Sequence, residues 1–147
     1  MSVEVTLTGR LGNNLFQYTI GRIIAEHHGF ELNCSRAFSP EVTFMGKVID
    51  IGPPALLEGL TAYFPNAPLH LPGKRVSAPM DSFELGVRGA WDGSTMDLAG
   101  VLADRSQRQI RLKGYFQRYE YFESFQKQIR YWLDFKPIAS PHTINIQ

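Results

Sequence analysis

The sequence is poor in cysteine, since Cys34 is the only one among 147 residues. A single thiol cannot close an internal disulfide, and no cysteine and histidine set has the spacing of a structural zinc site. The N-terminus lacks the basic segment and apolar core of a secretory signal, and no apolar run approaches the ~20 residues that cross a bilayer. We therefore expect a cytoplasmic protein without a membrane span.

Net charge is equally small. Fifteen Lys and Arg against 14 Asp and Glu leave a net charge of +1, which gives no electrostatic reason to expect nucleic acid or anionic membrane as a partner. The densest basic cluster is predicted to be a solvated face, and it consists of Arg105, Arg108, Arg111 and Lys113. The adjacent His27 and His28 point in different directions, so we expect surface histidines and no shared metal.

Several catalytic signatures are also missing. The chain contains no DxD metal motif, no GxSxG nucleophile elbow and no complete GxGxxG dinucleotide fingerprint. What it does contain is an ordinary globular composition, with 44% hydrophobic, 20% charged and 12% aromatic residues. Its length predicts one domain over residues 1–147, large enough to bury a core.

The N-terminal stretch has the pattern of a strand, a glycine turn, a helix and a second strand. Apolar and polar residues alternate over 3–7, which predicts a strand with one buried face. The apolar spacing then becomes helical over 14–28, Gly29 ends the helix, and extended character returns at 31–33. This unit opens an α/β fold, in which we expect the two strands to be parallel neighbours and the helix to be a right-handed crossover.

The glycine turn is the first candidate site. Free amides at a helix N-terminus favour an anion or an oxygen-rich ligand. Asn13 and Gln17 lie four residues apart, so both carboxamides are predicted to project from one side of the helix toward sugar hydroxyls or a phosphate. The alternative is structural: Gly9 and Gly12 make a tight turn, and Asn13 caps the helix.

The middle of the chain has fewer regular patterns. Residues 34–44 have no clean period and are predicted to loop, 47–51 is a short strand candidate, and 55–60 can form about one helical turn. Recurring prolines and glycines make 63–108 the irregular part of the domain.

Order returns near the C-terminus. Alternation over 109–114 predicts a strand, and Gln117 follows its end, where it can reach a crevice at the sheet edge. A helix then follows until Pro137, with Phe122, Phe125, Ile129 and Leu133 on one face. We interpret Phe122 and Phe125 as core.

Two blocks resemble α-1,2-fucosyltransferases. GRLGNNLFQYTIGRIIA is similar to their N-terminal motif GGLGNQMFQYAFGRALA, and IRLKGYFQRYEYF is similar to a strand ending in GYFQS and continuing xKYF. The matching positions are Gly9, Leu11, Gly12, Asn13, Phe16, Gln17, Tyr18, Gly21, Arg22, Ala25, Gly114, Tyr115, Phe116, Gln117, Tyr121 and Phe122.

The departures are few. Arg10 replaces the second glycine, as is typical of the related protein O-fucosyltransferases, and Asn14 replaces a glutamine. Arg118 and Glu120 stand where Ser and Lys are common. The family's HxRxGD motif, whose Arg holds the diphosphate of GDP-fucose, is absent from this sequence.

The resemblance implies a Rossmann-like α/β domain, the N-terminal, acceptor-side half of a GT-B glycosyltransferase. It implies a nucleotide sugar and a glycan acceptor as substrates, with no cofactor and no obligatory metal. The substrate-binding residues that it implies are Gly9, Arg10, Gly12, Asn13, Gln17 and Gln117. We expect the chain to be inactive without a donor-binding C-terminal domain, and its open cleft near Gly12 and Gly114 to favour self-association. A non-catalytic glycan- or nucleotide-binding module and an assembly-only remnant are the alternatives.

Overall fold

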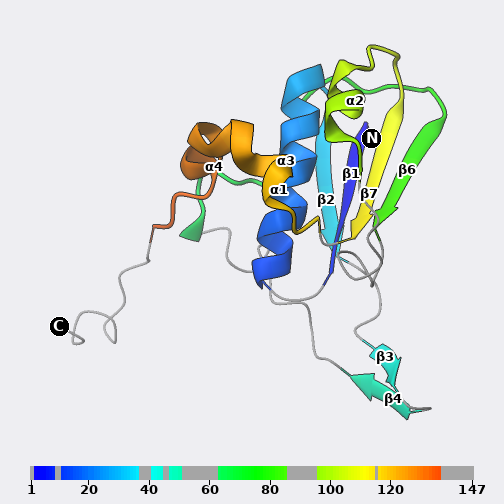
Figure 1. Ribbon diagram of the computed structural model, residues 1–147, viewed down its shortest axis with the longest axis vertical. Coiled ribbons are helices and arrows are strands. Elements are labelled where there is room, and N and C mark those ends of the chain that lie inside the picture. Colours follow the sequence, from blue (N-terminus) through cyan, green and yellow to red (C-terminus); the bar gives the residue numbers. More distant parts are fainter. Residues whose placement is uncertain are drawn as a thin grey trace.

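A computed structural model of the chain is shown in Figure 1. It describes residues 2–8, 11–36, 41–44, 47–50, 63–85, 96–114 and 116–136. The expected helical turn at 55–60, the turn residues Gly9 and Arg10, and Tyr115 lie outside the described residues.

The described strands form a mostly parallel sheet and a separate hairpin. The strand order in the larger sheet is β5-β2-β1-β7-β6, and only β5 runs antiparallel to its neighbour. The sheet strands are β1 (Val3–Leu7), β2 (Leu32–Arg36), β5 (His70–Leu71), β6 (Met80–Leu85) and β7 (Gln109–Gly114). The hairpin pairs β3 (Glu41–Phe44) with β4 (Lys47–Asp50).

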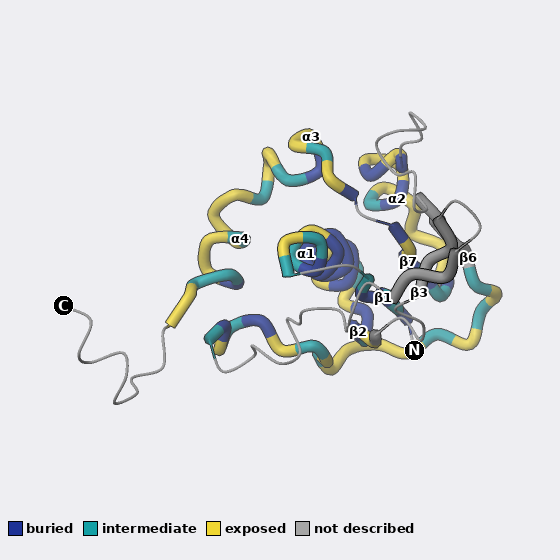
Figure 2. Tube along the Cα trace, turned by 90° about the horizontal axis from the view of Figure 1, so that it is seen from below, coloured by how far each residue is buried: buried dark blue, intermediate teal, exposed yellow. Residues whose placement is uncertain are grey.

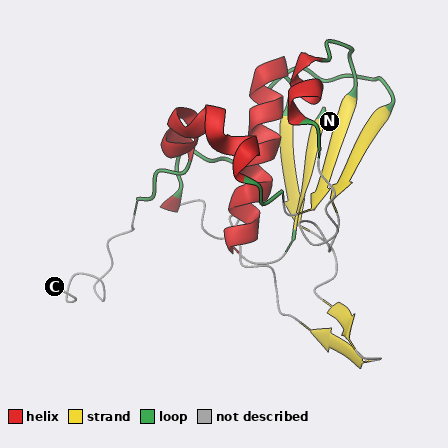
Figure 3. Cartoon of the chain, in the orientation of Figure 1, coloured by secondary structure: helices red, strands yellow, loops and turns green. Residues whose placement is uncertain are grey.

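The described helices gather on one face of this sheet (Figure 3). They are α1 (Leu11–His28), α2 (Leu98–Ala103), α3 (Tyr119–Phe122) and α4 (Gln126–Trp132), with a 3-10 turn at Glu123–Phe125 between the last two. Seen along its axis, α1 lies between the sheet and an arc formed by α3 and α4 (Figure 2). This places α1 in the centre of the domain.

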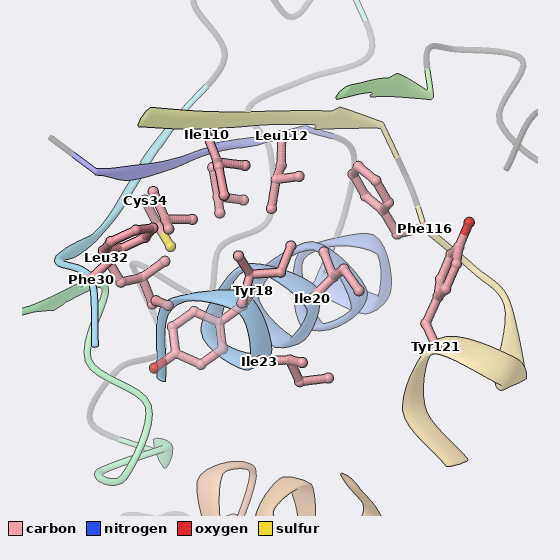
Figure 4. Close-up of a cluster of buried hydrophobic side chains, with 14 of the residues drawn as sticks. Tyr18, Ile20, Ile23, Phe30, Leu32, Cys34, Ile110, Leu112, Phe116 and Tyr121 are labelled. Atoms are coloured by element: carbon pink, nitrogen blue, oxygen red, sulfur yellow. The ribbon is translucent and has the colours of Figure 1, made fainter. Parts of the chain in front are cut away.

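The core lies between α1 and the strands (Figure 4). Val3, Val5 and Leu7 of β1 are fully buried, whereas the alternating Glu4 and Thr6 are half-buried on the opposite face of the sheet. The helix packs closely on β1 and β2 at Gly21, where an added Cβ atom would collide with the side chain of Val5. A glycine at this position therefore sets the helix-to-sheet spacing.

A buried arginine joins α1 to α4. The guanidinium of Arg22 lies over the ring of Trp132, 4.6 Å from its centroid. It also donates to the hydroxyl of Tyr18 at 3.0 Å and to the carbonyl of Asn66. These contacts fix the position of α4 against the outer side of α1.

The sequence predictions for the N-terminal unit are largely confirmed. β1 and β2 are parallel neighbours, and β7 has the predicted bounds. The helix begins at Leu11, three residues earlier than predicted, so Asn13 lies inside its first turn and is not the residue before it. The structural alternative, in which Asn13 caps the helix, is wrong for this reason.

Other predictions are corrected. The expected loop over 34–44 is wrong, because β2 continues to Arg36 along β1 and β3 begins at Glu41. The region predicted to be irregular contains β6, which pairs with β7 along its whole length. The expected continuous helix up to Pro137 is divided into α3, a 3-10 turn and α4, which ends at Trp132.

His27 is exposed as expected, but His28 is half-buried, and both rings contact the carboxyl end of α2. Nε2 of His27 lies 2.8 Å from the carbonyl oxygen of Leu102, and Nε2 of His28 lies 2.9 Å from that of Val101. Burial lowers the pKa of His28, helped by the nearby charges of His27, Arg108 and Arg105 and opposed by the bond to Val101.

This lowered pKa predicts a loss of stability in mild acid. Because the folded chain binds the His28 proton more weakly than the unfolded chain does, the stabilisation is present above the unfolded pKa of about 6.5 and is lost as pH falls through the folded pKa. Melting temperatures measured from pH 7 to pH 5 should fall less for His28→Gln than for the wild type. Parallel curves for the two proteins would contradict this prediction.

Cys34 is buried in β2, and burial raises the pKa of its thiol to about 12. Only the thiolate is nucleophilic, so at pH 8 the native thiol should react with a maleimide roughly a thousandfold more slowly than the unfolded one. Labelling followed by mass spectrometry, with and without guanidinium, measures the ratio. Equal rates in the two conditions would show that β2 is not packed as described.

Candidate functional site

The candidate site lies where the loops after β1 and β7 meet. Because these strands are parallel neighbours, their carboxyl ends lie at the same edge of the sheet. The first turn of α1 follows β1, and residues 116–118 follow β7. Nε2 of Gln117 donates a hydrogen bond to Oδ1 of Asn13 at 2.6 Å, across this edge. Two predicted site residues, far apart in sequence, are thus brought into contact.

Gln17 lies beneath this pair and is fully buried. Its Oε1 accepts from the backbone N–H of Thr8 at 3.0 Å, and its Nε2 donates to Oγ1 of Thr8 at 2.7 Å and to the carbonyl of Gly114 at 2.9 Å. One carboxamide therefore connects the ends of β1 and β7. This arrangement holds the two loops at a fixed separation.

Asn14 adds a second buried amide to the hydrogen bonds by which Gln17 connects the ends of β1 and β7. Its Nδ2 donates to the carbonyl of Thr8 at 3.0 Å and to Oε1 of Gln17 at 3.2 Å. Asn14 was noted in the sequence only as a departure from the family motif, yet it is as deeply buried as Gln17. Polar atoms at this depth are expected to have hydrogen-bond partners. Both polar atoms of Gln17 and Nδ2 of Asn14 have them, whereas Oδ1 of Asn14 is buried without one.

A pocket of about 560 Å³ opens beside the Asn13–Gln117 pair. It lies between α1 and the chain from Gln117 to Leu133, and its lining residues are Gly12, Leu15, Phe16, Thr19, Gln117, Tyr119, Phe122, Ile129 and Leu133. The rings of Phe16 and Phe122 contact each other within it, with centroids 5.6 Å apart and ring planes tilted by 49°. The volume is within the range of small-molecule sites.

The structure distributes the predicted site residues among three environments. Gly12 and Gln117 line the pocket, and Asn13 contacts Gln117 at its edge. Gln17 is enclosed behind the pocket, and Gly9 and Arg10 lie outside the described residues. Sequence reasoning missed Phe16 and Tyr119. It interpreted Phe122 as core, and this half-buried ring packs against the core as well as lining the pocket. The one sequence signal for Phe16 was its match to the motif, and the structure adds that its ring is 39% exposed.

The pocket is built for binding by contact and hydrogen bonding. None of its described lining residues is a carboxylate, an imidazole, a lysine or an arginine. Among the described residues no group of three or more His, Cys, Asp and Glu side chains is placed to hold a metal ion. The amide side chains can hydrogen-bond the hydroxyls of a ligand, and the aromatic rings can pack against its apolar part.

Fold and site together define an α/β protein with a mostly parallel sheet and a small pocket between α1 and the chain that follows β7, one end of which lies near the carboxyl edge of the sheet. The chain matches no protein-family model, no curated protein and no solved structure. Among the helices in the described ranges, none has the length and apolar character needed to span a bilayer.

Proposed function

We propose that this chain is the acceptor-side half of a GT-B glycosyltransferase that transfers fucose from GDP-fucose to a galactoside hydroxyl. The observation that carries the proposal is the Asn13–Gln117 hydrogen bond at the mouth of the pocket. The two residues come from the two sequence blocks that resemble the fucosyltransferases, and they converge at the sheet edge where α/β proteins bind ligands.

The carboxamides of this pair can bind the acceptor. One N–H of Gln117 is used on Asn13, which leaves its second N–H and its oxygen for a ligand, and Asn13 keeps its own NH₂ group. Tyr119 provides a hydroxyl that accepts from Gln126 at 3.0 Å and has its proton to donate. Such a set of alternating donors and acceptors suits sugar hydroxyls.

Donor chemistry has no support in this pocket. A departing diphosphate needs cationic or strongly donating groups around it, and the described lining contains no Lys or Arg. We therefore expect the isolated chain to bind a galactoside but to release no GDP from GDP-fucose. The same observation favours the second candidate, a non-catalytic glycan-binding module. Fucosyl transfer by the purified chain alone would contradict the proposal that this chain binds the acceptor and does not bind the donor for transfer.

Gln117→Ala should lower the affinity for methyl β-galactoside about tenfold, the effect of losing one to two hydrogen bonds to a ligand. Isothermal titration calorimetry measures the affinity. The melting temperature should stay almost unchanged, because Gln117 is exposed.

Gln107→Ala is the control for this experiment, since Gln107 is also exposed and precedes β7, at the other end of that strand. It should bind like the wild type. If the wild-type chain binds no galactoside, or if Gln117→Ala binds it normally, the proposed acceptor site is wrong.

A further inference from the structure

The pocket has a polar end and an apolar body. The chain from Gln117 to Trp132 passes around α1 (Figure 2) and advances along it toward its C-terminus, because Gln117 contacts Asn13, Phe122 contacts Phe16, and Trp132 contacts Arg22. Positions near Asn13 therefore lie at one end of the pocket and Thr19 lies about two helical turns away. The amides of Asn13 and Gln117 lie at the first end, whereas the hydroxyl of Tyr119 is bonded to Gln126.

The body of the pocket presents almost no polar group. Leu15, Phe16, Phe122, Ile129 and Leu133 supply its walls. Thr19 is the only hydroxyl-bearing residue along the α1 wall, and its Oγ1 donates to the carbonyl of Leu15 at 2.6 Å, within its own helix. A sugar placed here would lose hydrogen bonds to water without replacement, which is unfavourable.

We propose that the body of this pocket holds the apolar aglycone, alkyl or aryl, of the galactoside acceptor, while the sugar ring lies at the Asn13–Gln117 end. This inference rests on the proposed function and specifies its substrate class. The volume of about 560 Å³ accommodates a group larger than a single sugar ring, and Phe16 keeps an exposed apolar surface that such a group would cover.

The test is a series of methyl, butyl, hexyl and octyl β-galactosides, titrated calorimetrically into the wild-type chain below their micelle concentrations. Each added methylene that enters the pocket should raise the affinity about fourfold. Octyl β-glucoside, which carries the same chain on a different sugar, should bind more weakly than octyl β-galactoside.

A matched pair of variants locates the binding. Leu133→Ala removes an apolar side chain from the pocket wall, and Leu102→Ala makes the same change at a half-buried position on α2. Leu133→Ala should lower the octyl galactoside affinity about tenfold or more and leave the methyl galactoside affinity unchanged. Leu102→Ala should change neither. Melting curves show whether both variants are folded, and the ligand series in the wild type decides the question if one is not.

The outcomes separate the two proposals. If methyl and octyl galactosides bind equally, the aglycone site is wrong and the galactoside acceptor stands. If octyl galactoside and octyl glucoside bind equally while methyl galactoside does not bind, both the aglycone assignment and the proposed function are overturned.

Discussion

Gln17→Leu should lower the free energy of unfolding by about 3 kcal/mol, although leucine has a similar size. The change removes the partners of the Thr8 N–H, the Thr8 hydroxyl and the Gly114 carbonyl. A buried polar group left without a partner costs about 1–3 kcal/mol, and the Thr8 groups keep partial access to water. For a chain of this length the melting temperature should fall by roughly 10 °C.

The control is Gln128→Leu on the exposed face of α4, which should change stability by no more than about 0.5 kcal/mol. Denaturant unfolding followed by circular dichroism measures both variants. A Gln17→Leu protein as stable as the wild type would mean that the strand ends do not depend on this carboxamide. The Gln17 hydrogen bonds would then not be what holds the two loops of the candidate site together.

Gly21→Ala is expected to have the second large effect, a net loss of about 2 kcal/mol. Alanine is the better helix former by about 1 kcal/mol, so the substitution would stabilise an isolated helix. In the folded chain the added methyl group meets the side chain of Val5 in the central strand and comes within 3.3 Å of Leu32. Val5 is fully buried and stiff, so α1 must move away from the sheet.

Gly12→Ala on the same helix provides a control of opposite sign. An added Cβ at Gly12 meets nothing within 4 Å, and the backbone becomes less flexible when unfolded, so stability should rise by about 0.5 kcal/mol. Thermal unfolding of both variants tests the pair. If both glycines tolerate alanine equally, the close packing of α1 against β1 is wrong.

The sequence predicted the elements whose patterns are local. The alternation at 3–7 and 109–114 and the helical spacing of α1 each identify an element without reference to the rest of the chain. β6 and the second half of β2 have no such signal. They are strands because β7 and β1 supply their main-chain partners, and a pairing between distant segments is invisible to a local pattern.

The same distinction applies to the site. Asn13 and Gln117 were both expected to line the cleft, and they are in contact at the sheet edge. The burial of Gln17 could not be predicted. The four-residue spacing from Asn13 is the same whether the glutamine faces solvent or the ends of two strands. A cleft near Gly12 was expected, but its apolar wall was missed, because Phe122, Ile129 and Leu133 form an apolar stripe that is typical of a core.

The position of β1 between β2 and β7 has a consequence for synthesis on the ribosome. β2 emerges soon after β1, but β7 begins at Gln109, so one edge of the first strand stays unpaired until most of the chain has been translated. Pairings over such sequence distances are slow to form, and an open edge in the meantime invites pairing with other nascent chains. The N-terminal segment should therefore depend on chaperones during translation, although its strand, helix and second strand follow one another closely in the sequence.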